Sequence, residues 1–97
     1  MRVAEIILQQ LGGRQFIAMT GANHLCGDSN SLTFRVGRNS TNINLVRIEL
    51  NGKDLYNMFF YNFRGLEVKL IEKMNDVSCD QMNEIFESMT NMATSLH

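Results

Sequence analysis

The positions of the hydrophobic residues predict one helix at each end of this chain and strands between them. Near the N-terminus, Val3, Ile7 and Leu11 recur every four residues and fall on one side of a helix over residues 3–11. The glycine pair that follows is typical of a helix end, because glycine readily adopts the left-handed conformation that closes the last turn.

A second amphipathic helix is predicted over the last part of the chain. Ser78 and Gln81 have the spacing of a capping box, so we expect this helix to begin at Ser78. From there, apolar residues recur at spacings of three and four, which predicts one buried face. They are Met82, Ile85, Phe86, Met89, Met92 and Ala93.

Five segments between the helices carry the pattern of strands: residues 14–20, 31–37, 43–50, 55–63 and 66–73. The first is a short apolar run bounded by glycines, which suits a strand buried on both faces. In the last, Val68 and Leu70 are expected on one face, with Lys69 and Lys73 on the other. The polar stretch 21–30 is expected to be a loop, and the Asn51-Gly52 step favours a hairpin turn.

These elements predict an α+β fold. Strands joined by short turns form a mainly antiparallel sheet of about five strands, and an N-terminal and a C-terminal helix pack on one face to hide their apolar stripes. The length of 97 residues is that of a single domain covering residues 1–97. The pairing of the first strand stays open.

The segment 55–63 is apolar on both of its faces. One alternating set is Tyr56, Met58 and Phe60, and the other is Asn57, Phe59, Tyr61 and Phe63. The sequence leaves open which set faces the core, but the other set must lie on the opposite face. Arg35 and Arg47 point to that outer face by their own alternation. Aromatic and arginine side chains on a sheet suit a protein interface and, equally, the stacking of unpaired bases.

Composition and charge narrow the classes of function. Hydrophobic residues make up 44% and charged residues 20% of the chain, which is typical of a folded globular protein. The net charge of −1 argues against binding duplex nucleic acid through bulk positive charge. The longest apolar runs are far shorter than the roughly 20 residues that cross a bilayer, and the N-terminus is a poor signal peptide. We therefore expect a cytoplasmic protein with no membrane partner.

His24, Cys26 and Asp28 are the one place where a histidine, a thiol and a carboxylate crowd together. A zinc site here would need further ligands, such as Cys79 and His97, brought close by folding. A nucleophilic Cys26 activated by His24 would need a bent loop, because alternate residues of an extended segment point to opposite sides. We expect an exposed loop with two free thiols, no metal, no cofactor and no enzymatic activity, and keep the metal or thiol site as an alternative.

Residues 11–13, 16–22, 30–35, 46–51, 54–56 and 80–86 together resemble a family of small uncharacterised proteins of bacteriophages and other mobile genetic elements. The similarity spans nearly the whole chain and implies no catalytic residue. It implies a small accessory protein, acting inside a bacterial host cell, that binds a host or phage macromolecule. Where this family often has Leu-Pro, the chain has Val36-Gly37, so the loop that follows departs from the family pattern.

The sequence thus favours a non-enzymatic protein that binds a host or phage protein complex, such as an inhibitor of a host defence nuclease (anti-CRISPR-like). The expected contact residues are Arg35, Arg47, Phe59 and Tyr61. The alternative is a single-stranded nucleic-acid-binding protein that uses the same face. A homodimer would be a further way to hide the strand that is apolar on both faces.

Overall fold

The computed structural model describes residues 3–94, which form three helices and five strands. In chain order these elements are α1 (Val3–Leu11), α2 (Arg14–Thr20), β1 (Asn23–Gly27), β2 (Ser31–Arg35), β3 (Leu45–Leu50), β4 (Tyr56–Arg64), β5 (Glu67–Val77) and α3 (Met82–Thr90). The helix predicted over residues 3–11 is confirmed.

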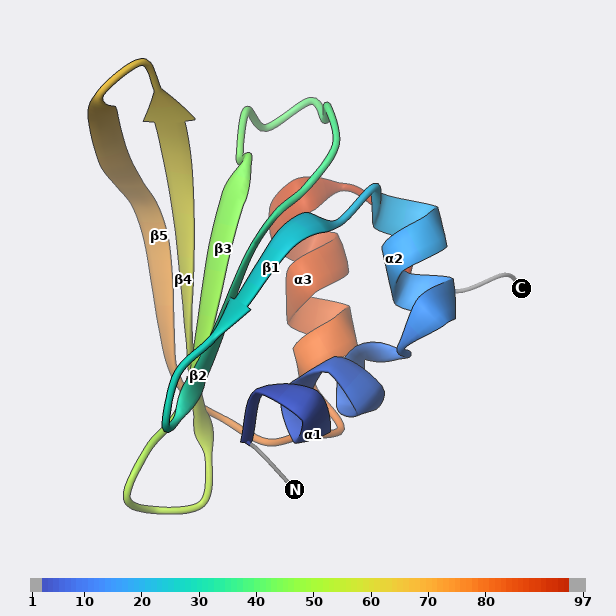
Figure 1. Ribbon diagram of the computed structural model, residues 1–97, viewed down its shortest axis with the longest axis vertical. Helices are drawn as coiled ribbons and strands as arrows, with labels where there is room; N and C mark the ends of the chain where they lie inside the picture. Colours follow the sequence, from blue (N-terminus) through green and yellow to red (C-terminus); the bar gives the residue numbers. More distant parts are fainter. Residues whose placement is uncertain (1–2, 95–97) are drawn as a thin grey trace.

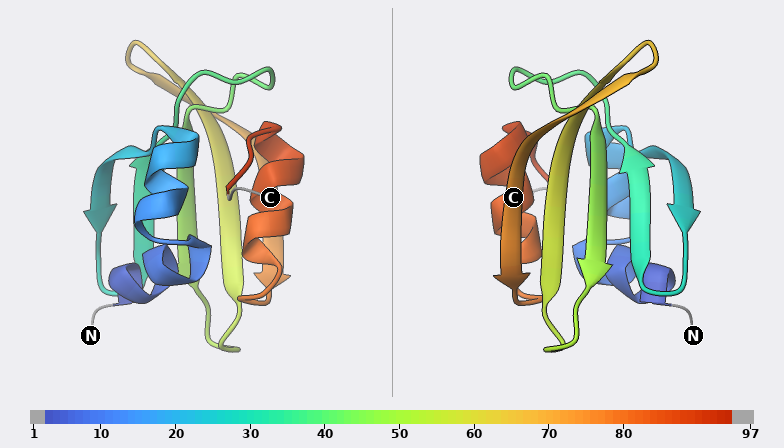
Figure 2. Two further views of the ribbon diagram at one scale, coloured as in Figure 1. Left: turned by 90° about the vertical axis from the view of Figure 1, so that its right-hand side faces the viewer. Right: turned by 90° about the vertical axis from the view of Figure 1, so that its left-hand side faces the viewer.

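The strands form one antiparallel sheet in the order β1-β2-β3-β4-β5, so each strand pairs with its neighbours in the sequence. The three helices lie on one face of this sheet, and no element of residues 3–94 covers the other (Figures 1 and 2). The predicted α+β class, with its antiparallel sheet and its helices packed on one face, is confirmed. The hairpin of β4 and β5 extends past the helical layer, beside the loop formed by residues 36–44 (Figure 1).

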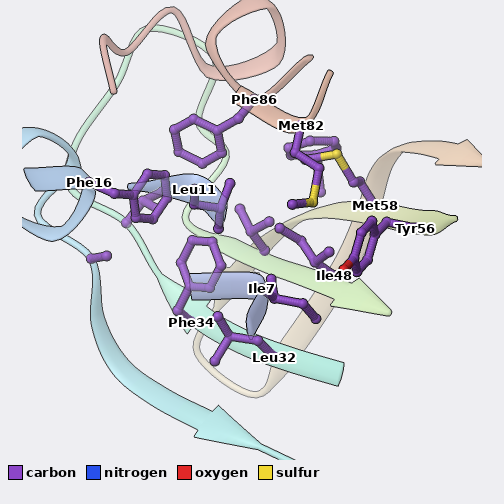
Figure 3. Close-up of a cluster of buried hydrophobic side chains, with 14 of the residues drawn as sticks. Ile7, Leu11, Phe16, Leu32, Phe34, Ile48, Tyr56, Met58, Met82 and Phe86 are labelled. Atoms are coloured by element: carbon purple, nitrogen blue, oxygen red, sulfur yellow. The ribbon is translucent and has the colours of Figure 1, made fainter. Parts of the chain in front are cut away.

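The core fills the space between the helices and the sheet (Figure 3). At its centre the ring of Phe16 from α2 meets Phe34 of β2 and Phe86 of α3 edge-on, with centroids 5.5 and 5.1 Å apart. Complete burial of such a side chain contributes about 1.5–3 kcal/mol. On β4, the alternation left open by the sequence is now resolved, because the set that contains Met58 and Phe60 faces this core.

The prediction of a strand over residues 14–20 is wrong, because this segment is α2. Its two fully buried residues, Phe16 and Thr20, are four apart, which is the spacing of one helix face. The hydroxyl of Thr20 donates to the carbonyl of Phe16 at 2.7 Å. Gly21 then ends the helix in the left-handed conformation at φ 69°, and its N–H donates to the carbonyl of Ile17.

The first strand lies instead within residues 21–30, which the sequence predicted as a loop. β1 pairs with β2 at the edge of the sheet, and all five of its residues are exposed. A strand with neither face buried has no hydrophobic alternation, so its composition resembled that of a loop. The number of strands is therefore as expected, but the first strand is a different segment.

Two local predictions near the C-terminal helix also need correction. α3 begins at Met82 rather than at Ser78, and no side chain caps it. The Ser78 hydroxyl donates to the Asp80 carboxylate at 2.6 Å instead, and the Gln81 N–H closes a turn onto the Ser78 carbonyl at 2.9 Å. In β5, the register shifts at Ile71, so Lys73 lies on the same face as Val68 and Leu70 rather than opposite to them.

Candidate interaction surface

The face of the sheet opposite the helices is left uncovered by the described residues, and we call it the outer face (Figure 2, right). Residues paired across neighbouring antiparallel strands share a face, so the register gives its members. Over β2 to β5 they include Ser31, Thr33, Arg35, Leu45, Arg47, Glu49, Asn57, Phe59, Tyr61, Phe63, Val68, Leu70 and Lys73. All four contact residues expected from the sequence lie on this face.

Phe59 is at the centre of the outer face. Its ring lies parallel to that of Tyr61, with centroids 6.3 Å apart and 7° between the planes. The guanidinium carbon of Arg47 is 5.6 Å from the Phe59 ring centroid, and the Lys73 ammonium is 5.0 Å from it. Arg47 and Lys73 are held there because they pair with Phe59 from the strands on either side. Each such cation–π contact contributes about 0.5–1 kcal/mol at an exposed site.

Two carboxylates fix Arg47. Its guanidinium donates to Glu49 at 2.9 Å and lies 3.9 Å from Asp28. The pKa of Asp28 is lowered mainly by the backbone N–H of Asn30, which donates to its carboxylate, and further by Ser31 and Arg47. The positive charge of Arg47 is thus balanced locally, and the guanidinium plane is oriented before any partner binds.

Arg35 is different, because it forms no ion pair within residues 3–94. It is exposed, and its guanidinium carbon lies 4.8 Å from the centroid of the Phe63 ring. The backbone of Phe63 is held in turn by the Asn44 side chain. Its N–H donates to Asn44 Oδ1 at 2.6 Å, and its carbonyl accepts from Asn44 Nδ2 at 2.7 Å. Arg35 and Lys73, which is also exposed and has no ion pair within residues 3–94, are therefore the cations of this surface that are available to an acidic partner.

Sequence reasoning missed the apolar edge of the outer face. Val68 is 52% and Leu70 49% exposed, and they pair with Phe63 and Tyr61 respectively. Phe63 and Lys73 were also missed as members of the site. The alternation of residues 66–73 was visible in the sequence, but nothing in it showed that the apolar set of β5 faces away from the core.

The structure does not bring His24, Cys26 and Asp28 together as a ligand set. Within residues 3–94 no three histidine, cysteine or acidic residues are close enough to hold a metal ion, and His97 lies outside the described residues. Cys26 and Cys79 are both exposed and free. Asp28 turns instead toward Arg47.

A hollow of about 590 Å³ opens beside the tip of the β4–β5 hairpin and shares Phe63 with the outer face. Amide and cationic side chains, including Asn42, Asn62, Arg64 and Lys69, line it. The described lining contains no carboxylate, histidine or thiol, so it supplies no pair of groups for acid–base chemistry.

Comparison with protein-family models, with curated proteins and with solved structures finds no match to this chain. Over residues 3–94, none of the helices has the length and apolar character needed to cross a membrane.

Proposed function

We propose that this protein is a non-enzymatic binding module that docks a protein partner through the outer face. The proposal rests on one observation: the Phe59–Tyr61 stack, with cations beside it, lies on a face that no helix or loop of the described residues covers (Figure 2). Half-buried rings and arginines on a preformed, rigid sheet are the residue types enriched at protein interfaces.

The charge of the outer face favours a protein over a nucleic acid. Three cations, Arg35, Arg47 and Lys73, face two carboxylates, Asp28 and Glu49, that already engage Arg47. The surplus is thus a single positive charge, and the whole chain carries −1. A partner with an apolar patch beside an acidic group fits this surface, because Leu70 and Tyr61 supply apolar area and Arg35 supplies an unpaired cation.

Site-specific photo-cross-linking in living cells tests the proposal. A photoreactive residue replaces Tyr61 in one variant and Gln15, which is exposed on α2, in a matched control. The expected result is one protein cross-linked strongly from position 61 and not from position 15. Adding Arg35→Ala should abolish that cross-link with little change in the thermal midpoint. Equal cross-linking from both positions would refute the proposal.

A single-stranded nucleic acid is the second candidate, favoured by the parallel rings of Phe59 and Tyr61 with cations beside them. Bases stack on such rings, and phosphate contacts make the affinity fall steeply with salt. Fluorescent oligonucleotides titrated at two salt concentrations separate the candidates. Tight binding that weakens with salt and is lost in Tyr61→Ala would establish this function in place of protein docking.

The resemblance to proteins of bacteriophages supports a narrower form of the proposal, in which the partner is a host defence nuclease complex in the bacterial cytoplasm. Such a protein inhibits by occupying a surface of its target. Expressed in a bacterium with a nuclease-based defence, it should raise the plating efficiency of a targeted phage. The double variant Arg35→Ala/Tyr61→Ala should lose this effect, whereas Gln15→Ala should keep it.

A further inference from the structure

β5 leaves one long side of the sheet unpaired within the described chain. It is the longest strand, with 11 residues, and its one strand neighbour is β4. All but two of its residues are exposed, and the hairpin that carries it extends past the helical layer (Figures 1 and 2). An exposed edge presents unpaired N–H and C=O groups that can pair with another strand.

The exposed residues of β5 are unusually apolar for an edge strand. Val68, Leu70 and Ile71 are 52%, 49% and 41% exposed. They lie in the first half of the unpaired strand, where Lys69 stands between Val68 and Leu70 and Glu72 follows Ile71. Water contact with this apolar group is unfavourable, so a strand that covers it would be stabilised.

The register shift at Ile71 makes β5 complementary to a second copy of itself. Before Ile71 in the sequence, Val68 lies on the outer face and Lys69 on the face that carries the helices. After Ile71, Lys73 lies on the outer face and Glu72 on the face that carries the helices. In an antiparallel pair centred between Leu70 and Ile71, Lys69 therefore opposes Glu72 of the second copy on the same face. Val68 then opposes Lys73, and Leu70 opposes Ile71.

This register brings the charges into two symmetric Lys69–Glu72 pairs, with the apolar residues between them at the twofold axis. Neighbouring registers are worse. Centring the pair on Ile71 places Lys69 opposite Lys73, and centring it on Leu70 places Val68 and Glu72, which lie on different faces, opposite each other. Like charges and mismatched faces across strands are both unfavourable.

We propose that two copies of this protein pair through β5 in this register and form a continuous ten-stranded sheet. A twofold contact of this kind is self-complementary, and it joins the two outer faces on one side of the dimer. A strand-edge contact belongs among the small interfaces, so its dissociation constant is expected in roughly the micromolar range. The proposal does not depend on what the outer face binds.

Charge reversal tests both the contact and its register. Lys69→Glu alone, or Glu72→Lys alone, turns two attractive pairs into two repulsive ones and should weaken dimerisation by about tenfold or more. Mixing the two variants in equal amounts restores both pairs in a heterodimer, so sedimentation velocity should show dimer again. Arg14→Glu on α2, which makes the same change in charge as Lys69→Glu, should dimerise like the wild type.

Circular dichroism should first show that each variant is folded, before its dimerisation is compared with that of the wild type. A wild-type protein that stays monomeric up to its solubility limit would overturn the proposal. So would a dimer that the single variants leave intact, or a mixture that stays monomeric. Because these variants leave Tyr61 and Arg35 unchanged, cross-linking from the outer face should persist in them, and the two proposals can fail separately.

Discussion

Gly27 lies where β1 approaches α1 too closely for any residue with a Cβ atom. A Cβ atom at this position would lie 2.5 Å from the Cβ of Ala4 on α1, which is closer than two carbon atoms can approach. Gly27→Ala should therefore lower the free energy of unfolding by about 1–3 kcal/mol, since α1 must move away from β1. Urea denaturation measures this loss.

Gly52 provides the matched control. A Cβ atom there would meet nothing within 4 Å, and its φ is not positive. Gly52→Ala should leave the free energy of unfolding within about 0.5 kcal/mol of the wild-type value. If the two variants were equally stable, the close approach of α1 to β1 would be wrong.

Asp28 predicts a dependence of stability on pH. Its pKa is lowered below the ordinary 3.8, first by the Asn30 N–H and then by Ser31, with a smaller effect of Arg47. A carboxyl group whose pKa is lower in the folded state stabilises the fold above its unfolded pKa, and the contribution is lost as pH falls through the folded pKa. The urea midpoint of wild-type protein should therefore exceed that of Asp28→Asn by more at pH 6 than at acid pH below 3.8. A difference that does not change with pH would contradict this.

Among the irregular elements, the loop of residues 36–44 depends on Asn39. Its Nδ2 donates to the carbonyls of Gly37 and Ile43 at 3.1 and 2.6 Å, and its Oδ1 accepts from the N–H and hydroxyl of Thr41 at 3.1 and 2.6 Å. Asn39→Ala leaves these half-buried groups without partners and should cost about 1–3 kcal/mol.

Hydrogen exchange of the loop amides should rise in Asn39→Ala and stay unchanged in Arg38→Ala, whose exposed side chain forms no hydrogen bond or ion pair with the described residues. Equal exchange in both variants would show that the backbone alone holds the loop.

The elements with a strong hydrophobic periodicity could be predicted from the sequence. Those whose conformation depends on contacts with residues elsewhere in the fold could not. α1 and β2 to β4 bury one helical or alternating set, which the sequence displays. The alternation of β5 is also visible in the sequence, although its apolar set is exposed. Residues 16–19 are a four-residue apolar run that fits a buried strand and a buried helix equally well. The segment is a helix in the structure, where Phe16 packs against Phe34 and Phe86. Ser78 had the sequence of a cap, but the nearby Asp80 takes its hydroxyl.

The candidate surface was predictable to the same extent. Alternation placed Arg35 and Arg47 on the outer face, and it reduced β4 to two possible sets. It could not show that Glu49 and Asp28 would engage Arg47, because Asp28 reaches it from the end of a strand that was expected to be a loop. Nor could it place Lys73 beside Phe59, which requires the register shift at Ile71.

At the scale of the whole molecule, the core lies between the helices and one face of the sheet, so we expect energetic coupling between residues within this core. Phe16 and Phe86 come from helices far apart in the sequence, yet their rings meet edge-on at 5.1 Å. Such a pair contributes about 0.5–1.5 kcal/mol beyond the area it buries. A double-mutant cycle with Phe16→Leu and Phe86→Leu should show a coupling free energy of this size, because leucine keeps most of the volume and removes the ring contact.

The matched cycle pairs Phe16→Leu with Phe59→Leu on the outer face. These rings lie on opposite sides of the sheet and share no partner, so their effects should add to within about 0.3–0.5 kcal/mol. If the helices pack on one face of the sheet only, the two substitutions of the first cycle should be energetically coupled and those of the second should be additive. Additivity in the first cycle would mean that α2 does not pack its ring against α3, and a strand at residues 14–20 would then have to be reconsidered.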